Sequence, residues 1–257
     1  MLSYQHLYHA GNRADVHKHA LLAWVLQYLG QKPKPISYIE THSGRGLYDL
    51  GAPEALKTGE AAAGIARLEA RFAADHPYLH ALAQTRADHG PDAYPGSPKV
   101  AASLMRAGDR MALAELHPRE FAALEAAMGR QAKVERTEGF AFARSVCPPE
   151  PRRGVLLCDP SFEVKQDYQD IPGFFRDIAR KWNVGILMLW YPILPGEVHQ
   201  PMVRAMERDF PEALVSETRF PQLVPGKGIM GSGMFVVNPP WGMAEEAARI
   251  EALVSKP

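Results

Sequence analysis

The order of hydrophobic and polar residues along the chain predicts an alternation of helices and strands. Apolar residues recur at helical spacing over residues 15–30, and the short apolar run at 36–40 that follows is typical of a buried strand. The same alternation continues to the end of the chain. It predicts further helices over residues 97–108, 118–129, 168–182, 196–209 and 243–255, and further strands over residues 110–117, 132–140, 152–159, 184–192, 213–220 and 233–241. Strands that alternate with helices form a mostly parallel sheet with helices on both faces, so we expect an α/β fold.

Two stretches depart from this alternation. The last two predicted strands have no helix between them, so we expect a hairpin and one antiparallel edge strand. Residues 47–96 contain two helical stretches and no clear sheet strand. We interpret this segment as a small helical insertion into a main domain formed by residues 1–46 and 97–257.

Composition narrows the class of protein only loosely. The chain has 257 residues, 46% of them hydrophobic and 23% charged, which suits one large globular domain. The formal net charge is zero, so a nucleic acid would have to be bound by a local patch. Cys147 and Cys158 have no metal or redox spacing, and no apolar run reaches the length of a membrane span. We expect a cytoplasmic protein without membrane contact.

Polar residues and glycines follow four of the predicted strands. They lie at residues 40–46, 115–117, 138–140 and 159–162. Each stretch alone is compatible with a plain turn or a solvated strand end. In open parallel sheets, however, ligands bind beyond the carboxyl ends of the strands, where glycines allow close approach of the backbone and an acid can accept ribose hydroxyls. Four such stretches in succession therefore predict a ligand site at this edge of the sheet.

The glycine loop favours one cofactor over another. Gly44-Arg45-Gly46 does not match the Gly-x-Gly-x-x-Gly pattern, and no glycine cradle opens a helix that could bind a pyrophosphate. S-adenosylmethionine (SAM) carries no phosphate and needs no such cradle. The order of the motifs therefore resembles a class I SAM-dependent methyltransferase more than a nicotinamide enzyme.

The stretch Asp159-Pro160-Ser161-Phe162 lies where amino-group methyltransferases carry D/N/S-P-P-Y/F/W. An exocyclic amine on a base is a poor nucleophile because its lone pair is delocalised into the ring. Asp159 and the Pro160 carbonyl could accept its two hydrogens and favour a tetrahedral nitrogen. Phe162 could stack on a base that has swung out of its helix, although the ring could also be ordinary core.

A second stretch, Asn-Pro-Pro-Trp at residues 238–241, matches the same pattern letter for letter. Only 16 residues follow Trp241, and all the strand ends that carry acids lie upstream. We therefore assign residues 238–241 to the end of the last strand. The simpler interpretation is a strand capped by prolines, with Trp241 covering the sheet.

Several histidines lie near the N-terminus. The spacing of His6, His9, His17 and His19 matches no standard zinc site, so we expect no metal. The stretch His17-Lys18-His19 lies on a predicted helix next to the first strand end. Contact with the cofactor or with RNA is the better explanation for it.

Taken together, the motifs resemble those of the bacterial 23S rRNA (adenine-N6)-methyltransferases of the large-subunit J type. The resemblance runs nearly end to end, including the insertion after the glycine loop. It is carried by residues 1–22, 40–51, 94–98, 114–118, 185–192 and 232–241. The resemblance implies a Rossmann-like methyltransferase sheet, SAM as the methyl donor and protein-free 23S rRNA as the partner, and we expect a monomer.

The resemblance also carries residue roles onto this chain. It implies cofactor binding by His19, His42, Ser97, Glu115, Glu138, Gly139 and Asp159. It implies that Asp159 is the catalytic proton acceptor and that Tyr4 lies near the RNA substrate. From the chemistry of the residues themselves, we add Pro160 and Phe162 to the predicted catalytic turn, and we expect Lys18 and Phe162 near the RNA. The family usually has D-P-P-Y at residues 159–162 and Asp-Gly at 138–139. The residues here keep the acid, the Pro160 carbonyl, an aromatic face and an acceptor for the amino group of the cofactor's adenine.

Other functions share part of this pattern. A DNA adenine-N6 or rRNA guanine-N2 methyltransferase would use the same chemistry. A protein-glutamine methyltransferase would carry N-P-P-Y, which Asp159 disfavours. A SAM-binding or RNA-binding module without turnover is disfavoured by the intact acids Asp159 and Glu115.

Overall fold

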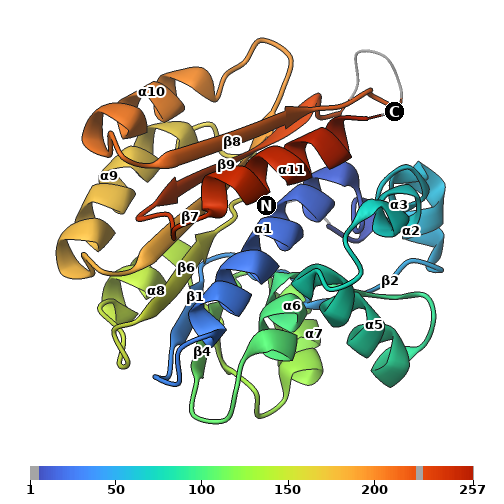
Figure 1. Cartoon of the computed structure of the whole chain (residues 1–257), viewed down its shortest axis with the longest axis horizontal. Coiled ribbons are helices and arrows are strands. Elements are labelled where there is room, and N and C mark those ends of the chain that lie inside the picture. The colour runs from blue at the N-terminus through green and yellow to red at the C-terminus, as the bar shows by residue number, and fades with distance from the viewer. Residues whose placement is uncertain (1–5, 224–227, 257) are drawn as a thin grey trace.

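A seven-stranded β-sheet forms the central layer of the fold, between two layers of helices (Figure 1). The structure is a computed structural model and describes residues 6–223 and 228–256. Every neighbouring pair of strands in the sheet is parallel except the two pairs that contain β9. The strand order is β5 (Lys133–Glu135), β4 (Arg110–Ala114), β1 (Ser37–Glu40), β6 (Gly154–Cys158), β7 (Ile186–Ile193), β9 (Gly231–Val237) and β8 (Leu214–Arg219). The predicted Rossmann-like sheet is thereby confirmed.

The expected hairpin is formed by β8 and β9, but the antiparallel strand does not lie at the edge of the sheet, where it was expected. The antiparallel strand is β9, which lies one place in from the edge, and β8 forms the edge itself. Burial explains this order. Every residue of β9 is buried, which suits an interior strand, whereas β8 alternates between buried and partly exposed residues.

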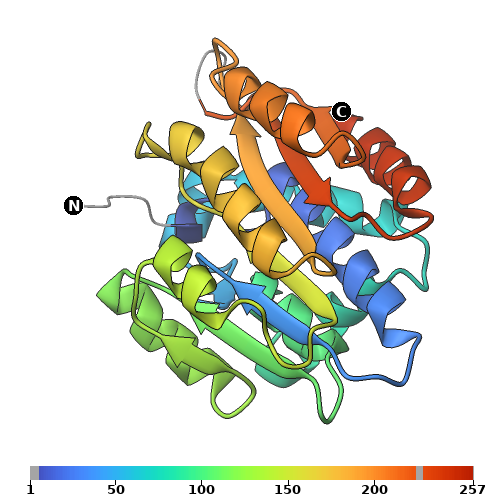
Figure 2. The same ribbon diagram turned by 90° about the vertical axis from the view of Figure 1, so that its left-hand side faces the viewer.

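The apolar residues of the sheet separate into two cores with the two-residue period of a strand. Leu157 faces one core and its neighbours Leu156 and Cys158 face the other. The first core is covered by α1 (Arg13–Gly30), α5 (Pro77–His89), α6 (Ser97–Leu104), α7 (Pro118–Met128) and α11 (Met243–Ser255). The second is covered by α8 (Gly139–Val146), α9 (Asp167–Lys181) and α10 (Gln200–Asp209), which face the viewer in Figure 2. Among the described residues, no helix combines the length and the apolar character needed to cross a membrane.

Three helices differ in detail from the sequence prediction. Helix α1 begins at Arg13 because the Asn12 side chain caps it by accepting a hydrogen bond from the Asp15 amide. Helix α6 begins at Ser97 as predicted but ends at Leu104, and the Ser97 hydroxyl donates a hydrogen bond to Glu40. Helix α8 was missed, because the short stretch that starts at Gly139 was interpreted as a turn after a strand.

The segment 47–96 begins and ends with two short strands, β2 (Leu47–Asp49) and β3 (Ala93–Pro95), which pair antiparallel. Between them lie α2 (Pro53–Thr58), α3 (Glu60–Ala63), α4 (Ile65–Leu68), a 3₁₀ turn (Glu69–Arg71) and α5. The first of the two expected helices is therefore broken at Gly64. A Cβ at Gly64 would lie 2.2 Å from the Gly11 carbonyl oxygen, and that oxygen accepts a hydrogen bond from the Ile65 amide. The close contact of Gly64 and Ile65 with Gly11 therefore interrupts the helix between α3 and α4.

The insertion shares its core with the rest of the chain. Ile65, Leu68, Tyr78 and Leu82 belong to the same apolar cluster as Leu22 of α1. The division into a main domain of residues 1–46 and 97–257 and an insertion of residues 47–96 stays a prediction. The shared core means that removal of the insertion would expose apolar side chains of α1.

Candidate functional site

A cavity of about 450 Å³ lies beyond the carboxyl ends of β1, β4, β5 and β6. This is the edge at which open parallel sheets bind ligands, and the volume is within the usual range for small-molecule sites. The lining includes all the site residues predicted from the sequence that the structure describes: Lys18, His19, His42, Ser97, Glu115, Glu138, Gly139, Asp159, Pro160 and Phe162. Tyr4 lies outside the described residues. The four separate strand ends therefore meet in one place.

The glycine loop after β1 is shaped by two left-handed backbone positions. Gly44 and Gly46 have φ angles of 58° and 74°, which residues that carry a side chain rarely adopt. A Cβ at Gly44 would also lie 2.6 Å from the Tyr48 hydroxyl. Between the two glycines, Arg45 forms a double hydrogen bond with Glu120 of α7, at 2.9 and 2.7 Å. These contacts hold the loop against the cavity wall.

Glu115 follows β4, and backbone amides orient its carboxylate. Oε2 accepts a hydrogen bond from the Gly44 amide at 2.9 Å, and Oε1 accepts one from the His117 amide at 2.7 Å. Burial raises the pKa of Glu115 above its ordinary value, although the two amides act in the opposite direction. Each oxygen keeps a lone pair, so a pair of ribose hydroxyls remains the predicted ligand of this carboxylate.

Glu115→Ala is expected to weaken SAM binding by about 10- to 150-fold, the equivalent of ~1.5–3 kcal/mol for charge-assisted hydrogen bonds. Titration calorimetry with SAM measures this directly. Glu125→Ala is the matched control, because Glu125 is an exposed acid on α7 outside the cavity. Equal SAM affinity in the Glu115 and Glu125 variants would contradict the ribose role.

Glu138 and Gly139 lie at the start of α8, where Gly139 packs closely against the backbone that follows β1. The Glu138 carboxylate caps α8 by accepting hydrogen bonds from the amides of Phe140 at 2.9 Å and Ala141 at 2.7 Å. A Cβ at Gly139 would lie 2.2 Å from the carbonyl oxygen of Thr41, so only glycine fits there. Both residues thus have a structural role that the sequence did not indicate. Their contact with the cofactor stays a prediction.

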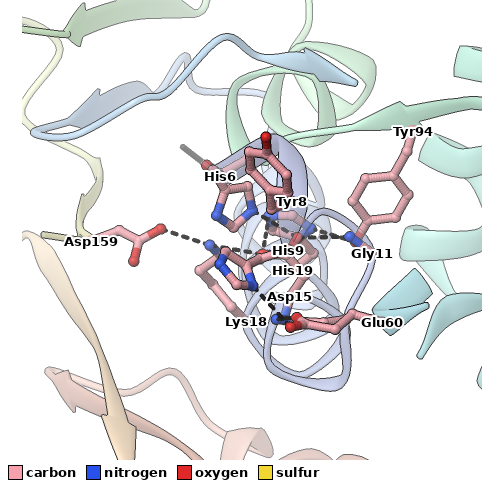
Figure 3. A network of polar contacts seen from close by, with 12 residues as sticks. His6, Tyr8, His9, Gly11, Asp15, Lys18, His19, Glu60, Tyr94 and Asp159 are labelled. Atoms are coloured by element: carbon pink, nitrogen blue, oxygen red, sulfur yellow. Dashed lines mark hydrogen bonds and ion pairs between the residues drawn. The ribbon is translucent and has the colours of Figure 1, made fainter. Parts of the chain in front are cut away.

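Asp159 is held by a lysine that is itself shared between two acids (Figure 3). The Lys18 Nζ atom lies 2.6 Å from Asp159 Oδ2 and 3.1 Å from Asp15 Oδ1. Burial acts to lower the pKa of Lys18, but the two carboxylates outweigh it and raise the pKa above the ordinary value. Lys18 is therefore a permanent cation beside the predicted catalytic acid.

Asp15 is a site residue that the sequence analysis missed. Its buried carboxylate accepts hydrogen bonds from His6 Nε2 at 2.9 Å and from the Gly11 amide at 3.0 Å, in addition to the contact with Lys18. Burial acts to raise the pKa of Asp15, yet the surrounding histidines and Lys18 hold it well below its usual range. The available signal was the spacing: Asp15 lies three residues before Lys18, on the same face of a helix.

The residues of the stretch His17-Lys18-His19 face different elements. Lys18 and His19 line the cavity, and His19 Nδ1 lies 3.1 Å from the Tyr94 hydroxyl. His17 does not line it, so the expectation that the whole stretch contacts cofactor or RNA is wrong for His17. Burial lowers the pKa of both histidines to about 3, which keeps them neutral. Within the described part of the chain, no group of three or more His, Cys, Asp or Glu is arranged to hold a metal ion.

Ser97 reaches a fully buried acid at the end of β1. The Ser97 hydroxyl and the Tyr38 hydroxyl donate hydrogen bonds to the two oxygens of Glu40, the latter at 2.7 Å. Burial raises the pKa of Glu40 to about 8, although both hydroxyl donors act to lower it. Glu40 therefore titrates near neutral pH directly beneath the cavity wall.

This titration predicts a pH dependence of stability. The folded state holds the Glu40 proton more tightly than the unfolded state does. Protonated Glu40 therefore makes its full contribution to the free energy of unfolding below about pH 4.5. This contribution is lost as the pH rises towards about 8, at up to ~1.4 kcal/mol per pH unit. Glu40→Gln removes this contribution. The free energy of unfolding of the native chain, measured in urea relative to Glu40→Gln, is expected to fall between about pH 5.5 and about pH 7.5. A difference that does not change with pH would contradict a raised Glu40 pKa.

The turn that follows Asp159 holds Phe162 in a left-handed conformation, with a φ angle of 55°. A bulky residue in this region is an outlier that costs about 1–3 kcal/mol, and such strain clusters at functional sites. The Phe162 ring lines the cavity but is only 6% exposed, and it packs on Tyr168 and Trp190 at centroid distances of 4.7 and 6.3 Å. Its use as a stacking face stays a prediction.

The Asn-Pro-Pro-Trp stretch lies at the other end of the sheet. Because β9 runs antiparallel, its carboxyl end lies beside the amino ends of the parallel strands. The Asn238 amide group donates hydrogen bonds to the carbonyl oxygens of Asn183 and Gly185, at 3.1 and 2.8 Å. Trp241 is 87% exposed, so the expectation that it covers the sheet is wrong. Residues 238–241 do not contribute to the cavity.

Comparison with known proteins agrees with this geometry. Residues 33–256 match the family described as "Ribosomal RNA large subunit methyltransferase D, RlmJ". Ribosomal RNA large subunit methyltransferase J of Escherichia coli K12 is 35% identical over 96% of this chain and 90% of its own length, and the Haemophilus influenzae protein of the same name is 33% identical over 100% and 94%.

A solved structure extends the likeness to three dimensions. The protein LPL1258 from Legionella pneumophila superposes with a TM-score of 0.85 at 32% identity, over 95% of this chain and 92% of that one. The family match covers more than half of the chain, and the relatives match it along nearly their whole length. The chain belongs to the ribosomal RNA large subunit methyltransferase J family.

Proposed function

We propose that this chain transfers the methyl group of SAM to the N6 amino group of an adenine in protein-free 23S rRNA, with Asp159 as the catalytic acceptor. As a member of its family, the chain is a SAM-dependent methyltransferase, and the related proteins are named for action on ribosomal RNA. The observation that carries the finer proposal is the position of Asp159 and Pro160. They lie at the end of β6, in the same cavity as Glu115 and Ser97.

The residues that line the cavity suit SAM. Bound SAM supplies an electrophilic methyl group, and the sulfur of SAM keeps the electron pair of the broken carbon–sulfur bond. The two glycines of the loop after β1 allow the backbone to approach a ligand closely, and the orientation of the Glu115 carboxylate suits a ribose. His42, Ser97 and Glu138 would complete the cofactor site. No phosphate-binding cradle is required, which agrees with the absence of the Gly-x-Gly-x-x-Gly pattern.

The acceptor side of the site suits an exocyclic amine. The Lys18 contact uses Asp159 Oδ2 and so leaves Oδ1 to accept one hydrogen of the amine, while the Pro160 carbonyl accepts the other. The nitrogen then becomes tetrahedral, and its lone pair points towards the methyl group. As the new bond to carbon forms, the nitrogen releases one proton to Asp159. The ion pair with Lys18 fixes the direction of the carboxylate throughout.

Guanine-N2 and DNA adenine-N6 methylation require the same two acceptors. An assay of different nucleic acids separates RNA from DNA methylation, and the identity of the labelled nucleoside separates adenine from guanine. We expect label from methyl-tritiated SAM to enter protein-free 23S rRNA, and to enter DNA, protein and assembled ribosomal subunits far less. Label in DNA or protein but not in rRNA would contradict the proposal. Label in none of them, from a chain that binds SAM by calorimetry, would instead indicate a module without turnover.

A further inference from the structure

A buried chain of hydrogen bonds leads from the cavity to helix α11. It begins at Trp190 of β7, whose Nε1 atom donates to the Ser232 hydroxyl at 2.9 Å. Ser232 Oγ lies 2.9 Å from His17 Nδ1, and His17 Nε2 lies 3.0 Å from Ser216 Oγ. The Ser216 hydroxyl donates to Glu251 Oε1 at 2.6 Å. Four consecutive hydrogen bonds thus connect a residue of the cavity wall to an acid on the covering helix.

The direction of each hydrogen bond in this series follows from its two ends and from the neutral state of His17. The indole N–H can only donate, and the carboxylate oxygen accepts from Ser216. Ser216 must therefore accept from His17 Nε2–H, and Ser232 must donate to His17 Nδ1. This assignment requires a neutral imidazole, and burial lowers the pKa of His17 to about 3. His17, Ser216 and Ser232 are fully buried, so water does not compete for the two hydrogen bonds of His17.

This series of hydrogen bonds holds the Trp190 indole, which lies on the catalytic side of the cavity. Trp190 lines the cavity, and the Lys18 Nζ atom lies 5.5 Å from its ring centroid. The Phe162 ring packs against the same indole edge-on, with the ring centroids 6.3 Å apart. Lys18 in turn forms the 2.6 Å ion pair with Asp159. The indole therefore contacts both the cation that orients Asp159 and the ring behind the catalytic turn.

We propose that Trp190 is a positioning residue that aligns Lys18 and Phe162 against Asp159, and that the hydrogen bonds through Ser232 and His17 set the orientation of its indole. The proposal rests on the methyltransferase function proposed above. Within the described residues, His17, Ser216, Ser232 and Glu251 do not line the cavity. Ser232 therefore acts on the cavity through its two hydrogen-bond partners, the Trp190 indole and His17, and Trp190→Phe separates the first route from the second.

Trp190→Phe tests this alignment, because it keeps an aromatic ring and removes the N–H donor. We expect kcat for methylation of 23S rRNA to fall by about fivefold, the usual effect of one lost hydrogen bond, while SAM affinity stays within about twofold. Ser232→Ala breaks the same bond from its other end and should lower kcat equally. The double variant Trp190→Phe with Ser232→Ala should lower kcat no further than either single change. Trp24→Phe is the control, because Trp24 stacks on Tyr28 away from the cavity.

Melting temperatures separate positioning from packing. Ser232→Ala leaves the buried Nδ1 atom of His17 without a partner, so we expect a lower melting temperature together with the lower kcat. If both single variants melt earlier but keep the kcat of the Trp24 control, or if their effects on kcat add in the double variant, the inference is overturned. Because the native chain is assayed alongside, failure of this inference is distinct from failure of the proposed function. A native chain that methylates no acceptor would overturn both.

Discussion

Replacing Asp159 by alanine is expected to lower kcat for methyl transfer by ~10²–10³-fold or more, because a preorganised acceptor contributes that much to a reaction in which charge develops. The change removes the acceptor of the amine proton and also the partner of Lys18, whose Nζ atom lies 2.6 Å from Asp159 Oδ2. Lys18 would keep only its contact with Asp15. SAM binding can weaken as well, since Asp159 lies in the same cavity as Glu115.

Two further variants make this result interpretable. Asp159→Asn keeps one oxygen acceptor but loses the ion pair, so its kcat should lie between those of the native chain and the alanine variant. Asp88→Ala removes an exposed acid of α5 outside the cavity and should behave like the native chain. Single-turnover rates at saturating SAM separate loss of chemistry from loss of cofactor binding. Near-native turnover in Asp159→Ala would show that residues 159–162 do not form the catalytic turn.

Phe162→Ala is expected to lower kcat/KM by about 5- to 150-fold, because stacking of an aromatic ring on a base contributes ~1–3 kcal/mol. An extruded adenine has its edge occupied by Asp159 and the Pro160 carbonyl, so its face is what remains for the protein to hold. The ring is also 6% exposed and packs on Tyr168 and Trp190. We therefore expect the melting temperature to fall as well.

Phe162→Tyr provides the matched comparison. It keeps the ring, and we expect kcat/KM close to that of the native chain because stacking uses the face and not the hydroxyl. Kinetics on an rRNA fragment, measured well below the melting temperature of each variant, separate the two roles of the ring. If Phe162→Ala is less stable yet keeps its kcat/KM, the ring is only part of the core and the stacking role is refuted.

The fold could be predicted largely from the sequence because alternating helices and strands leave few arrangements. The order of the strands could not be derived from the pattern of residues. Nothing local in residues 213–220 and 231–237 indicates which of the two hairpin strands takes the edge. Burial in the folded chain decides it, because every residue of β9 is buried, whereas Ser216 and Thr218 are the buried residues of β8. In the same way, the break at Gly64 depends on a contact with Gly11, more than fifty residues earlier, which helical spacing cannot reveal.

Which residues line the cavity could be predicted better than which of them contact one another. Strand ends carrying Glu115 and Asp159 could be recognised because parallel strands bring their carboxyl ends to one edge. The buried ion pairs could not, since nothing in the sequence of the helix shows that Lys18 lies between Asp15 and Asp159. Gly139 resembled a cofactor residue by position alone, whereas the close approach of the Thr41 carbonyl explains why a glycine is needed there. His17 shows the converse, because its neighbours face the cavity and it does not.

The most direct test of the account is the identity of the methylated nucleoside. Protein-free 23S rRNA is methylated by the native chain with labelled SAM, digested to nucleosides and separated by liquid chromatography with mass spectrometry. We expect the label to elute as N6-methyladenosine, and we expect no label when the Asp159→Ala variant is used in place of the native chain. Label in N2-methylguanosine, in a ring-methylated base or in a ribose-methylated nucleoside would contradict the assignment of Asp159 and Pro160 to the amino group of adenine.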